Sequence, residues 1–364
     1  MRNENSSSEE QPNGSSTIGT TIQVNDSQLG QSGGPNFARL FVRHEFVSPI
    51  LTVVQDVVDI YRREQYPKNL LIMGAARSGK SRLVEKICGY GIPVPNQRFP
   101  LKTIFASEVP SPVSIKSLVT MLLYSLGVAD PERGNTSMQT SRLIRLVQSL
   151  NIEMLVLDEF QHLVENRSSY VIEAVADWVK TLINQLKIPV VLVGLPECIA
   201  VFEQDDRGQL RGRFSKHLNI YPFEWKGHDP RRDGYSYSKL LGIIESELRL
   251  PCSSNLSDGR IAKRLLIASG GLIGFTVLLI EEAYRIAIRR NEQAISLELL
   301  EEAFEASYIT RRYEFGNPFR ASNKDIDLAI ERPSDQATGS NGFNRRLRRK
   351  NRDQQTSLSK RGAK

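Results

Sequence analysis

The sequence of 364 residues is 40% hydrophobic and 24% charged, which is ordinary for a soluble globular protein and predicts about two domains. No apolar run approaches the ~20 residues of a membrane span, and the polar N-terminus does not resemble a signal peptide. Three scattered cysteines and four histidines without metal-ligand spacing argue against a disulfide framework or a zinc site, and favour reduced thiols in a cytoplasm.

The net charge of +7 is concentrated at the C-terminus. Residues 344–364 hold nine Lys or Arg and one Asp, a charge of +8, so +7 minus +8 leaves −1 for the rest of the chain. The body is therefore not broadly basic, and any DNA contact it makes must come from a local patch. The tail itself suits DNA, RNA or an acidic protein about equally, and many such tails are simply solvated.

The N-terminal segment, residues 1–35, is rich in Ser, Asn, Gly, Gln and Thr. It cannot bury enough apolar surface to offset the entropy cost of ordering, so we expect it to be disordered. From Phe41 to Arg63 apolar residues recur at helical spacing and predict a helix, which Pro49 bends or divides in two.

A glycine-rich motif follows. Residues 74–81 read Gly-Ala-Ala-Arg-Ser-Gly-Lys-Ser, between the apolar Leu70–Met73 and an amphipathic stretch that starts at Arg82. The pattern predicts a buried strand, a phosphate-binding loop and a helix. Its glycines permit close backbone approach, so that loop amides meet phosphate oxygens at the positive end of the helix. Lys80 would reach the β- and γ-phosphates and Ser81 would hold Mg²⁺. The alternative, a chance glycine loop, is disfavoured by the flanking pattern.

The loop therefore predicts that the protein binds a nucleoside triphosphate. A helical lead-in before such a strand commonly packs near the nucleotide base. Arg43 and His44 then either border the base or form an exposed pair on a capping helix, and the sequence favours neither.

The next segment alternates between strand and helix patterns. Thr103–Ala106 predicts a second strand, and Ser114 can cap a helix over Ile115–Leu123. We expect a loop over residues 128–140 and an amphipathic helix over 141–150.

Two acidic residues end the third predicted strand, Glu153–Leu157. This pattern places the carboxylates of Asp158 and Glu159 at the C-terminal edge of a parallel sheet, where ligands bind in such folds. Asp158 would hold Mg²⁺ with its water shell, and Glu159 would polarise the attacking water as general base. The alternative, two acids that merely end a strand, loses weight because a phosphate loop precedes them.

A long helix over residues 171–186, a fourth strand over 188–194 and a fifth over 218–223 complete an alternating pattern. It predicts an α/β fold with a doubly wound parallel sheet of about five strands. Arg211 and Arg213 lie just before the fifth strand. Either could enter the site of a stacked neighbour and neutralise charge on the γ-phosphate, or could form a surface ion pair with Asp205 or Asp206.

Beyond this sheet the pattern becomes purely helical, with about four amphipathic helices between residues 236 and 307 that would form a lid. We expect four parts of the chain. They are a disordered segment (1–35), an ATP-binding core with its helical lead-in (36–232), a helical lid (233–310) and a flexible basic tail (311–364).

In the order and spacing of its segments the chain resembles the TniB/TnsC family of AAA+ ATPases, a group of P-loop NTPases that regulate DNA transposition. The resemblance covers roughly residues 36–310. Its more specific part is Asn-Gln-Leu-Lys-Ile-Pro-Val-Val-Leu-Val-Gly followed by Gln-Leu-Arg-Gly-Arg-Phe, since the phosphate loop and Asp-Glu indicate only AAA+ or a close relative.

The resemblance implies an ATPase that assembles in the ATP state as a ring or helical filament on double-stranded DNA. Such proteins link a target selector of the TniQ or TnsD type, in some systems with an RNA-guided CRISPR effector, to a TnsA/TnsB-like transposase. Hydrolysis then disassembles the complex. No membrane partner is expected.

The resemblance also implies which residues catalyse hydrolysis and which bind ATP. Asp158, Glu159 and Lys80 would serve catalysis with ATP and Mg²⁺, and Arg213 or Arg211 would act in trans. Residues expected to bind ATP are Gly74, Ala75, Ala76, Arg77, Ser78, Gly79, Lys80, Ser81 and Arg82. For DNA phosphates we expect Lys102 and Lys116.

The sequence departs from the pattern of its relatives in three places. Gly194-Leu195-Pro196, at the end of the fourth strand, has no polar sensor residue. Residues 269–275, in the lid, have no second-sensor arginine. These two departures predict slow, switch-like turnover. The third is Gln161-His162, which lies where relatives often have a histidine one position earlier.

Two other functions remain open from the sequence. One is a different AAA+ switch, such as an origin-recognition or secretion-associated ATPase, although few residues follow the lid for the C-terminal module that those proteins carry. The other is a scaffold that binds ATP without hydrolysing it, against which Glu159 argues.

Overall fold

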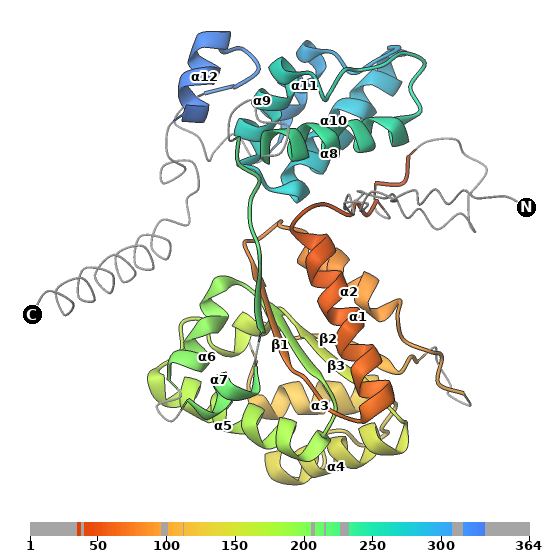
Figure 1. The fold of residues 1–364 in the computed structure, drawn as a ribbon, viewed down its shortest axis with the longest axis vertical. Coiled ribbons are helices and arrows are strands. Elements are labelled where there is room, and N and C mark those ends of the chain that lie inside the picture. The colour runs from red at the N-terminus through yellow and green to blue at the C-terminus, as the bar shows by residue number, and fades with distance from the viewer. Residues whose placement is uncertain are drawn as a thin grey trace, which may run out of the picture.

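The chain folds into a sheet-containing core and a helical lid, which lie one above the other in Figure 1. The expected disordered segment and the basic residues 345–364 lie, apart from residue 35, outside the described residues. The computed structural model describes residues 35–37, 40–95, 101–111, 113–204, 208–214, 216–225, 233–307 and 316–331.

Within the described residues, five parallel strands form a sheet in the order β2-β3-β4-β1-β5 (Figure 1). β1, β3 and β4 are buried at every position, as expected for apolar strands inside a covered parallel sheet. The predicted doubly wound α/β fold is thus confirmed. The strand bounds are Leu70–Gly74 (β1), Ile104–Glu108 (β2), Met154–Asp158 (β3), Val190–Gly194 (β4) and Lys216–Ile220 (β5).

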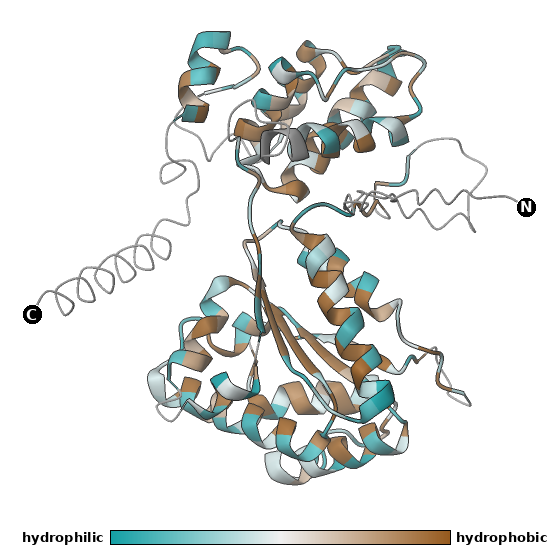
Figure 2. Cartoon of the chain, in the orientation of Figure 1, coloured by the Kyte–Doolittle hydropathy of each residue, from teal (hydrophilic) through white to brown (hydrophobic). Residues whose placement is uncertain are grey.

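Helices cover both faces of the sheet, because successive strand residues point to opposite sides. Leu70 and Ile72 pack with α1 and α2, whereas Leu71 and Met73 pack with α3, α4 and α5. Figure 2 shows the hydrophobic residues along the strands and on helix faces toward them. The helix bounds are Val47–Glu64 (α1), Lys80–Cys88 (α2), Ile115–Ser125 (α3), Thr136–Ser149 (α4), Ser169–Leu186 (α5), Ala200–Glu203 (α6) and Gln209–Arg213 (α7), with 3₁₀ turns at Phe160–Leu163 (η1) and Pro196–Ile199 (η2).

Two helices begin earlier or later than the sequence pattern predicts. α1 is one helix that starts at Val47, and Pro49 lies in its first turn, where the missing N–H costs no helical hydrogen bond. α4 starts at Thr136, inside the expected loop, because the Asn135 side chain caps it by accepting from Met138 N at 2.9 Å. β5 also lies slightly earlier than its predicted stretch.

The lid lies beyond the carboxyl end of β5 (Figure 1), and its helices share a hydrophobic core that includes Tyr237, Leu265 and Leu279. No single described helix is long and apolar enough to span a membrane. Together, α9 and α10 have the length and composition of a span, but the two helices are bent by 116° relative to each other. The lid helices are Asp233–Leu248 (α8), Gly259–Ser269 (α9), Ile273–Arg290 (α10) and Leu297–Ala306 (α11).

A further helix, α12 (Asn323–Glu331), packs against α9 and was not predicted by the sequence pattern. Lys263 forms an ion pair with Asp327 at 2.6 Å, and the buried Arg264 donates to the Ala321 carbonyl at 2.8 Å. The part of the chain expected to be a flexible tail therefore includes a packed helix. The domain boundaries themselves stay predictions.

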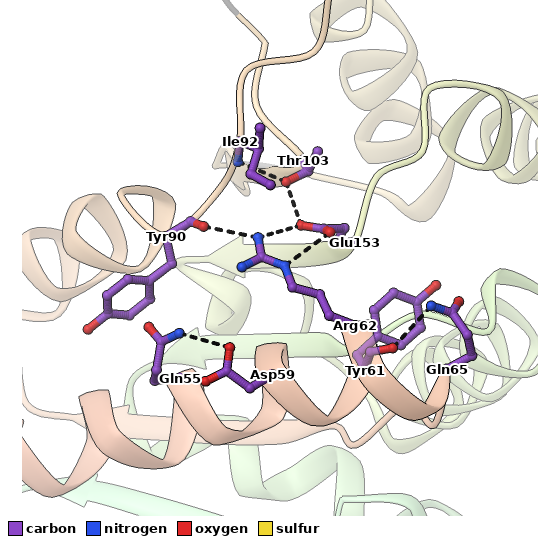
Figure 3. Close-up of polar contacts among 9 residues, drawn as sticks. All are labelled: Gln55, Asp59, Tyr61, Arg62, Gln65, Tyr90, Ile92, Thr103 and Glu153. Carbon is purple, nitrogen blue, oxygen red and sulfur yellow. Dashed lines mark hydrogen bonds and ion pairs between the residues drawn. The ribbon is translucent and has the colours of Figure 1, made fainter.

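One polar network fastens α1 to the sheet (Figure 3). Arg62 donates from Nε and Nη2 to the Glu153 carboxylate at 3.1 and 2.7 Å, and from Nη2 to the Tyr90 carbonyl at 3.2 Å. Thr103 donates to Glu153 at 2.6 Å and accepts from Ile92 N at 3.0 Å. Burial would raise the pKa of Glu153, but hydrogen bonds from Arg62 and Thr103 hold it below its usual value. The network thus joins α1, the residue just before β3 and the segment between α2 and β2.

Candidate nucleotide-binding site

The loop between β1 and α2 has the tight backbone that its motif predicts. Gly79 has φ of +96°, which favours glycine. A Cβ added to Gly74 would lie 2.5 Å from Ser78 Oγ and 3.2 Å from the Ile220 carbonyl oxygen of the neighbouring strand. The first glycine is therefore needed for close packing of the loop against β5, and the second for its turn into α2.

Lys80 lies inside the curve of this loop and is only 5% exposed. Its Nζ donates to the carbonyl oxygens of Gly74 and Ala75, both at 3.0 Å. Burial lowers the pKa of Lys80, while the negative charges of Glu159 and Asp158 oppose this shift. The structure thus brings the loop lysine and the two acids, far apart in sequence, into one electrostatic site.

The two acids differ in their surroundings. Asp158 is the last residue of β3 and is 7% exposed, and its Oδ1 accepts from Glu159 N at 2.8 Å. Burial raises the pKa of Asp158, against the effect of that N–H and of Lys80. Glu159 is half-buried and has a left-handed φ of +53°, which turns the chain sharply at the end of the strand. Asp158 therefore faces inward, whereas Glu159 is partly accessible to water.

The donor set suits Mg²⁺. Ser81 lies in the first turn of α2 and Asp158 ends β3, which gives one hydroxyl and one carboxylate. No group of three or more His, Cys, Asp or Glu that could form a metal cage exists among the described residues. Mg²⁺ commonly uses one or two protein oxygens together with substrate phosphates and water. When bound, it would supply positive charge beside the phosphate oxygens.

One residue of the site was missed by the sequence analysis. Gln161, in η1, is 2% exposed; its Nε2 donates to the Glu159 carboxylate and its Oε1 accepts from Leu195 N at 3.0 Å. The sequence analysis noted it only as a departure from the pattern of relatives and gave it no role. The sequence carries no local signal for its role, because both partners are set by the packing of η1 against the end of β4.

The lid contacts the phosphate loop through its backbone. Gly274 N, at the start of α10, donates to the Arg77 carbonyl at 2.9 Å. Arg77 itself has a left-handed φ of +66°. Gly271 accepts from Phe223 N at 2.8 Å, which ties the segment after β5 to the lid. The segment without an arginine, residues 269–275, is therefore the part of the lid that meets the loop.

His44 is not part of an exposed pair on a helix, which corrects one of the two expectations. It precedes α1, is 5% exposed and packs its ring against Phe223 and Phe46, with centroids 5.1 and 6.0 Å apart. Burial lowers its pKa to about 4, so the imidazole is neutral at pH 7. Its Nδ1 and the Nε of Arg43 are buried and have no hydrogen-bond partner among the described residues.

The two candidate trans arginines lie near the amino-terminal ends of the parallel strands. The phosphate loop lies at the opposite edge of the sheet, where the carboxyl-terminal ends of the strands meet. Lys216, just after them, pairs with Leu70 at the start of β1, whereas the loop follows the end of that strand. Arg211 Nε donates to the Phe202 carbonyl at 2.9 Å, and Arg213 Nη1 donates to the Gln209 carbonyl at 3.2 Å. Neither can serve the site of its own chain. The alternative partners, Asp205 and Asp206, lie outside the described residues.

The two lysines expected to contact DNA are exposed but belong to different segments. Lys102 forms an antiparallel bridge with Pro93 just before β2, whereas Lys116 lies in the first turn of α3, after β2. Their contact with DNA stays a prediction.

Solved structures with a similar fold include the archaeal ORC and Cdc6 proteins. Cdc6p from Pyrobaculum aerophilum gives a TM-score of 0.53 at 14% identity, over 78% of this chain and 71% of that one. The Aeropyrum pernix ORC2 protein in ADPNP–ADP complexes gives 0.51 at 12%, over 71% and 66%. The Aeropyrum pernix ORC1 protein in complex with DNA gives 0.51 at 15%, over 73% and 66%. The chain thus spans just under two thirds of the ORC1 and ORC2 chains, and these likenesses show the fold alone.

A comparison with curated protein sequences gives no match. The profile of the family described as "Bacterial TniB protein" matches residues 38–224, which is more than half of the chain. The matched segment runs from the lead-in ahead of α1 to the end of the sheet, and includes the phosphate loop and both acids. With its five-stranded AAA+ core, the chain belongs to the TniB family.

Proposed function

We propose that this protein is an ATP-dependent regulator of DNA transposition. Its ATP-bound form would assemble on double-stranded target DNA and link a TniQ/TnsD-like selector, with or without a CRISPR effector, to a TnsA/TnsB-like transposase. Hydrolysis of ATP would then disassemble it. The observation that carries the proposal is the convergence of Lys80, Asp158 and Glu159 in a chain of the TniB family.

The geometry supports hydrolysis by a general base. Glu159 would accept a proton from the water whose oxygen attacks the γ-phosphorus, while the bond from that phosphorus to the bridging oxygen of ADP breaks. Lys80 and the loop amides would bind the phosphates. Ser81 and Asp158 would hold Mg²⁺, which supplies charge stabilisation when bound.

The base of the nucleotide would lie beside His44. Phe223, against which its ring packs, is bonded to Gly271 of the lid, and the lid meets the phosphate loop three residues later at Gly274. Because burial keeps the His44 imidazole neutral at pH 7, it adds no charge where an uncharged base would lie.

Assembly is supported by where Arg211 and Arg213 lie. An arginine at the edge of the sheet opposite the phosphate loop can reach a phosphate only in a neighbouring subunit that stacks on this edge. A head-to-tail contact of this kind generates a ring or a helical filament. The ATP site would then be completed by a second copy of the chain.

Contact with DNA is supported by the exposed Lys102 and Lys116 and by the basic tail. A structural neighbour, the Aeropyrum pernix ORC1 protein, is itself described in complex with DNA. Because phosphate contacts release counterions, binding should weaken steeply with salt.

The test combines the purified protein, a non-hydrolysed ATP analogue and duplex DNA. We expect large assemblies on DNA by electron microscopy and sedimentation, which are lost in Lys80→Ala because the lysine contacts phosphates directly. Lys68→Ala, on a half-buried lysine ahead of β1, is the matched control and should assemble like wild type. If the wild-type protein stays monomeric and does not bind DNA, or Lys80→Ala assembles normally, the proposal is wrong.

A further inference from the structure

We propose that Gln161 is a positioning residue that holds the Glu159 carboxylate in a fixed place relative to the end of β4. The inference rests on the proposed hydrolysis by Glu159 and adds to it a residue to which the sequence analysis gave no role. The supporting observation is that the single side-chain amide of Gln161 both donates and accepts a hydrogen bond.

Both halves of the Gln161 amide have defined partners. The Nε2 group donates to Glu159 Oε2, and Oε1 accepts the backbone N–H of Leu195 at 3.0 Å. The residue is buried in η1, between the end of β3 and the end of β4. A buried amide whose donor and acceptor are both satisfied specifies one orientation, because any rotation would leave a polar group unpaired.

Gln161 also occupies a place where β4 has no polar side chain of its own. This strand ends in Gly194, followed by Leu195 and Pro196. A Cβ on Gly194 would lie 2.6 Å from Gln161 Oε1 and 2.5 Å from Cys198 Sγ, so the glycine leaves room for the amide. The polar group at this strand end therefore comes from η1 instead of from the strand.

This arrangement links Glu159 to the phosphate loop. Leu195 directly follows β4, and Gly194 pairs with Met73, the residue before the loop, in the adjacent β1. A hydrogen bond to Oε2 fixes the carboxylate rotamer and leaves Oε1 to take the proton from water. Gln161 thus sets the position of the base with respect to the phosphates, without touching them.

The experiment measures kcat for ATP hydrolysis and the dissociation constant for ATP in matched variants. Gln161→Glu has nearly the same shape and still accepts from Leu195 N, but loses the amide donor and places a second negative charge beside Glu159. We expect kcat to fall about 10- to 100-fold, as for other supporting partners of catalytic groups, with ATP affinity within about twofold of wild type.

Two further variants separate positioning from packing. Gln161→His keeps one donor and one acceptor on its neutral ring, so it should retain more activity than Gln161→Leu, which keeps neither. Gln55→Leu is the matched control, because Gln55 donates to Asp59 at 3.1 Å in the same type of bond on the surface of α1 (Figure 3). It should hydrolyse ATP like wild type.

The outcomes are distinguishable from failure of the proposed function. If wild type hydrolyses ATP no faster than Glu159→Gln, the proposed hydrolysis is wrong and this inference falls with it. If wild type is active but Gln161→Glu matches it, the inference alone is wrong. Equal losses of kcat and of ATP affinity in Gln161→His and Gln161→Leu would assign Gln161 to packing only and would likewise overturn it.

Discussion

At the scale of single residues, His44 is a buried base that must stay neutral in the folded protein. Its ring packs against two aromatic rings, and burial lowers its pKa to about 4 from an ordinary value of 6.5. Below pH 6.5 the unfolded chain therefore binds a proton that the folded chain does not. Folding stability should fall as the pH drops from 6.5 toward 4, and should be unaffected by this group above 6.5.

This predicts a pH effect that one substitution removes. At pH 5 the shift corresponds to about 2 kcal/mol of lost stability relative to pH 7. His44→Phe, which suits the aromatic surroundings, should lose about that much less between pH 7 and pH 5 than wild type, as measured by urea unfolding. Thr52→Val, at an exposed position of α1, changes no titratable group; it is the control and should keep the wild-type difference. An unchanged pH effect in His44→Phe would contradict a buried neutral His44.

Some residues of the site can be predicted from the sequence immediately around them, and others cannot. Gly74 to Ser81 could be predicted because a phosphate loop is built by consecutive residues, and Asp158 and Glu159 because they end an apolar strand. Their roles in binding and hydrolysis stay predictions. Gln161 could not be predicted, because its partners belong to β3 and β4 and meet only after packing.

At the scale of elements, the segment between α9 and α10 is what holds the lid on the core. Gly271 has φ of +70°, and a Cβ there would lie 2.0 Å from the Phe223 carbonyl oxygen. Its own carbonyl accepts from Phe223 N at 2.8 Å. Three residues later, Gly274 N bonds to the phosphate loop at Arg77. Backbone that approaches this closely leaves no space for a side chain.

A matched pair of glycines tests this contact. Gly271→Ala combines a strained φ with a backbone clash, so we expect the lid to be displaced and stability to fall by several kcal/mol. Gly208→Ala has a similar φ of +64°, but no atom of the described residues lies within 4 Å of the added Cβ, so the change should cost only about 1 to 2 kcal/mol. Thermal unfolding and limited proteolysis of the lid would measure the difference. Equal effects would show that φ strain, and not the contact with Phe223, decides the outcome.

The elements themselves were largely predictable, and the exceptions have physical reasons. The first turn of α4 is polar and is fixed by the Asn135 cap, so its hydrophobic period starts too late to reveal it. α12 contributes the buried Ile326 and is held by α9, so its short pattern is weak without that partner. Hydrophobic periodicity in the sequence reveals the buried face of a helix. It does not reveal helical turns that are stabilised by a capping side chain or by packing against a distant element.

At the scale of the whole molecule, the order of the strands decides what one chain can do alone. Parallel strands pair over long sequence distances, so the alternating pattern predicted the sheet but not its order. That order puts β4 between β1 and β3, and brings the loop and the acids to one edge. The same direction of all strands places Arg211 and Arg213, ahead of β5, at the other edge.

A mixing experiment tests whether the site is shared between two chains. Arg213→Ala keeps its phosphate loop and acids but supplies no arginine, whereas Glu159→Gln supplies the arginine but lacks the base. Each alone should hydrolyse ATP very slowly on DNA. In a 1:1 mixture, about a quarter of head-to-tail interfaces would join an intact site to an intact arginine and should restore about a quarter of wild-type activity. Arg211→Ala, tested in the same way, assigns the role between the two arginines. If neither mixture exceeds the sum of its separate variants, neither arginine acts in trans.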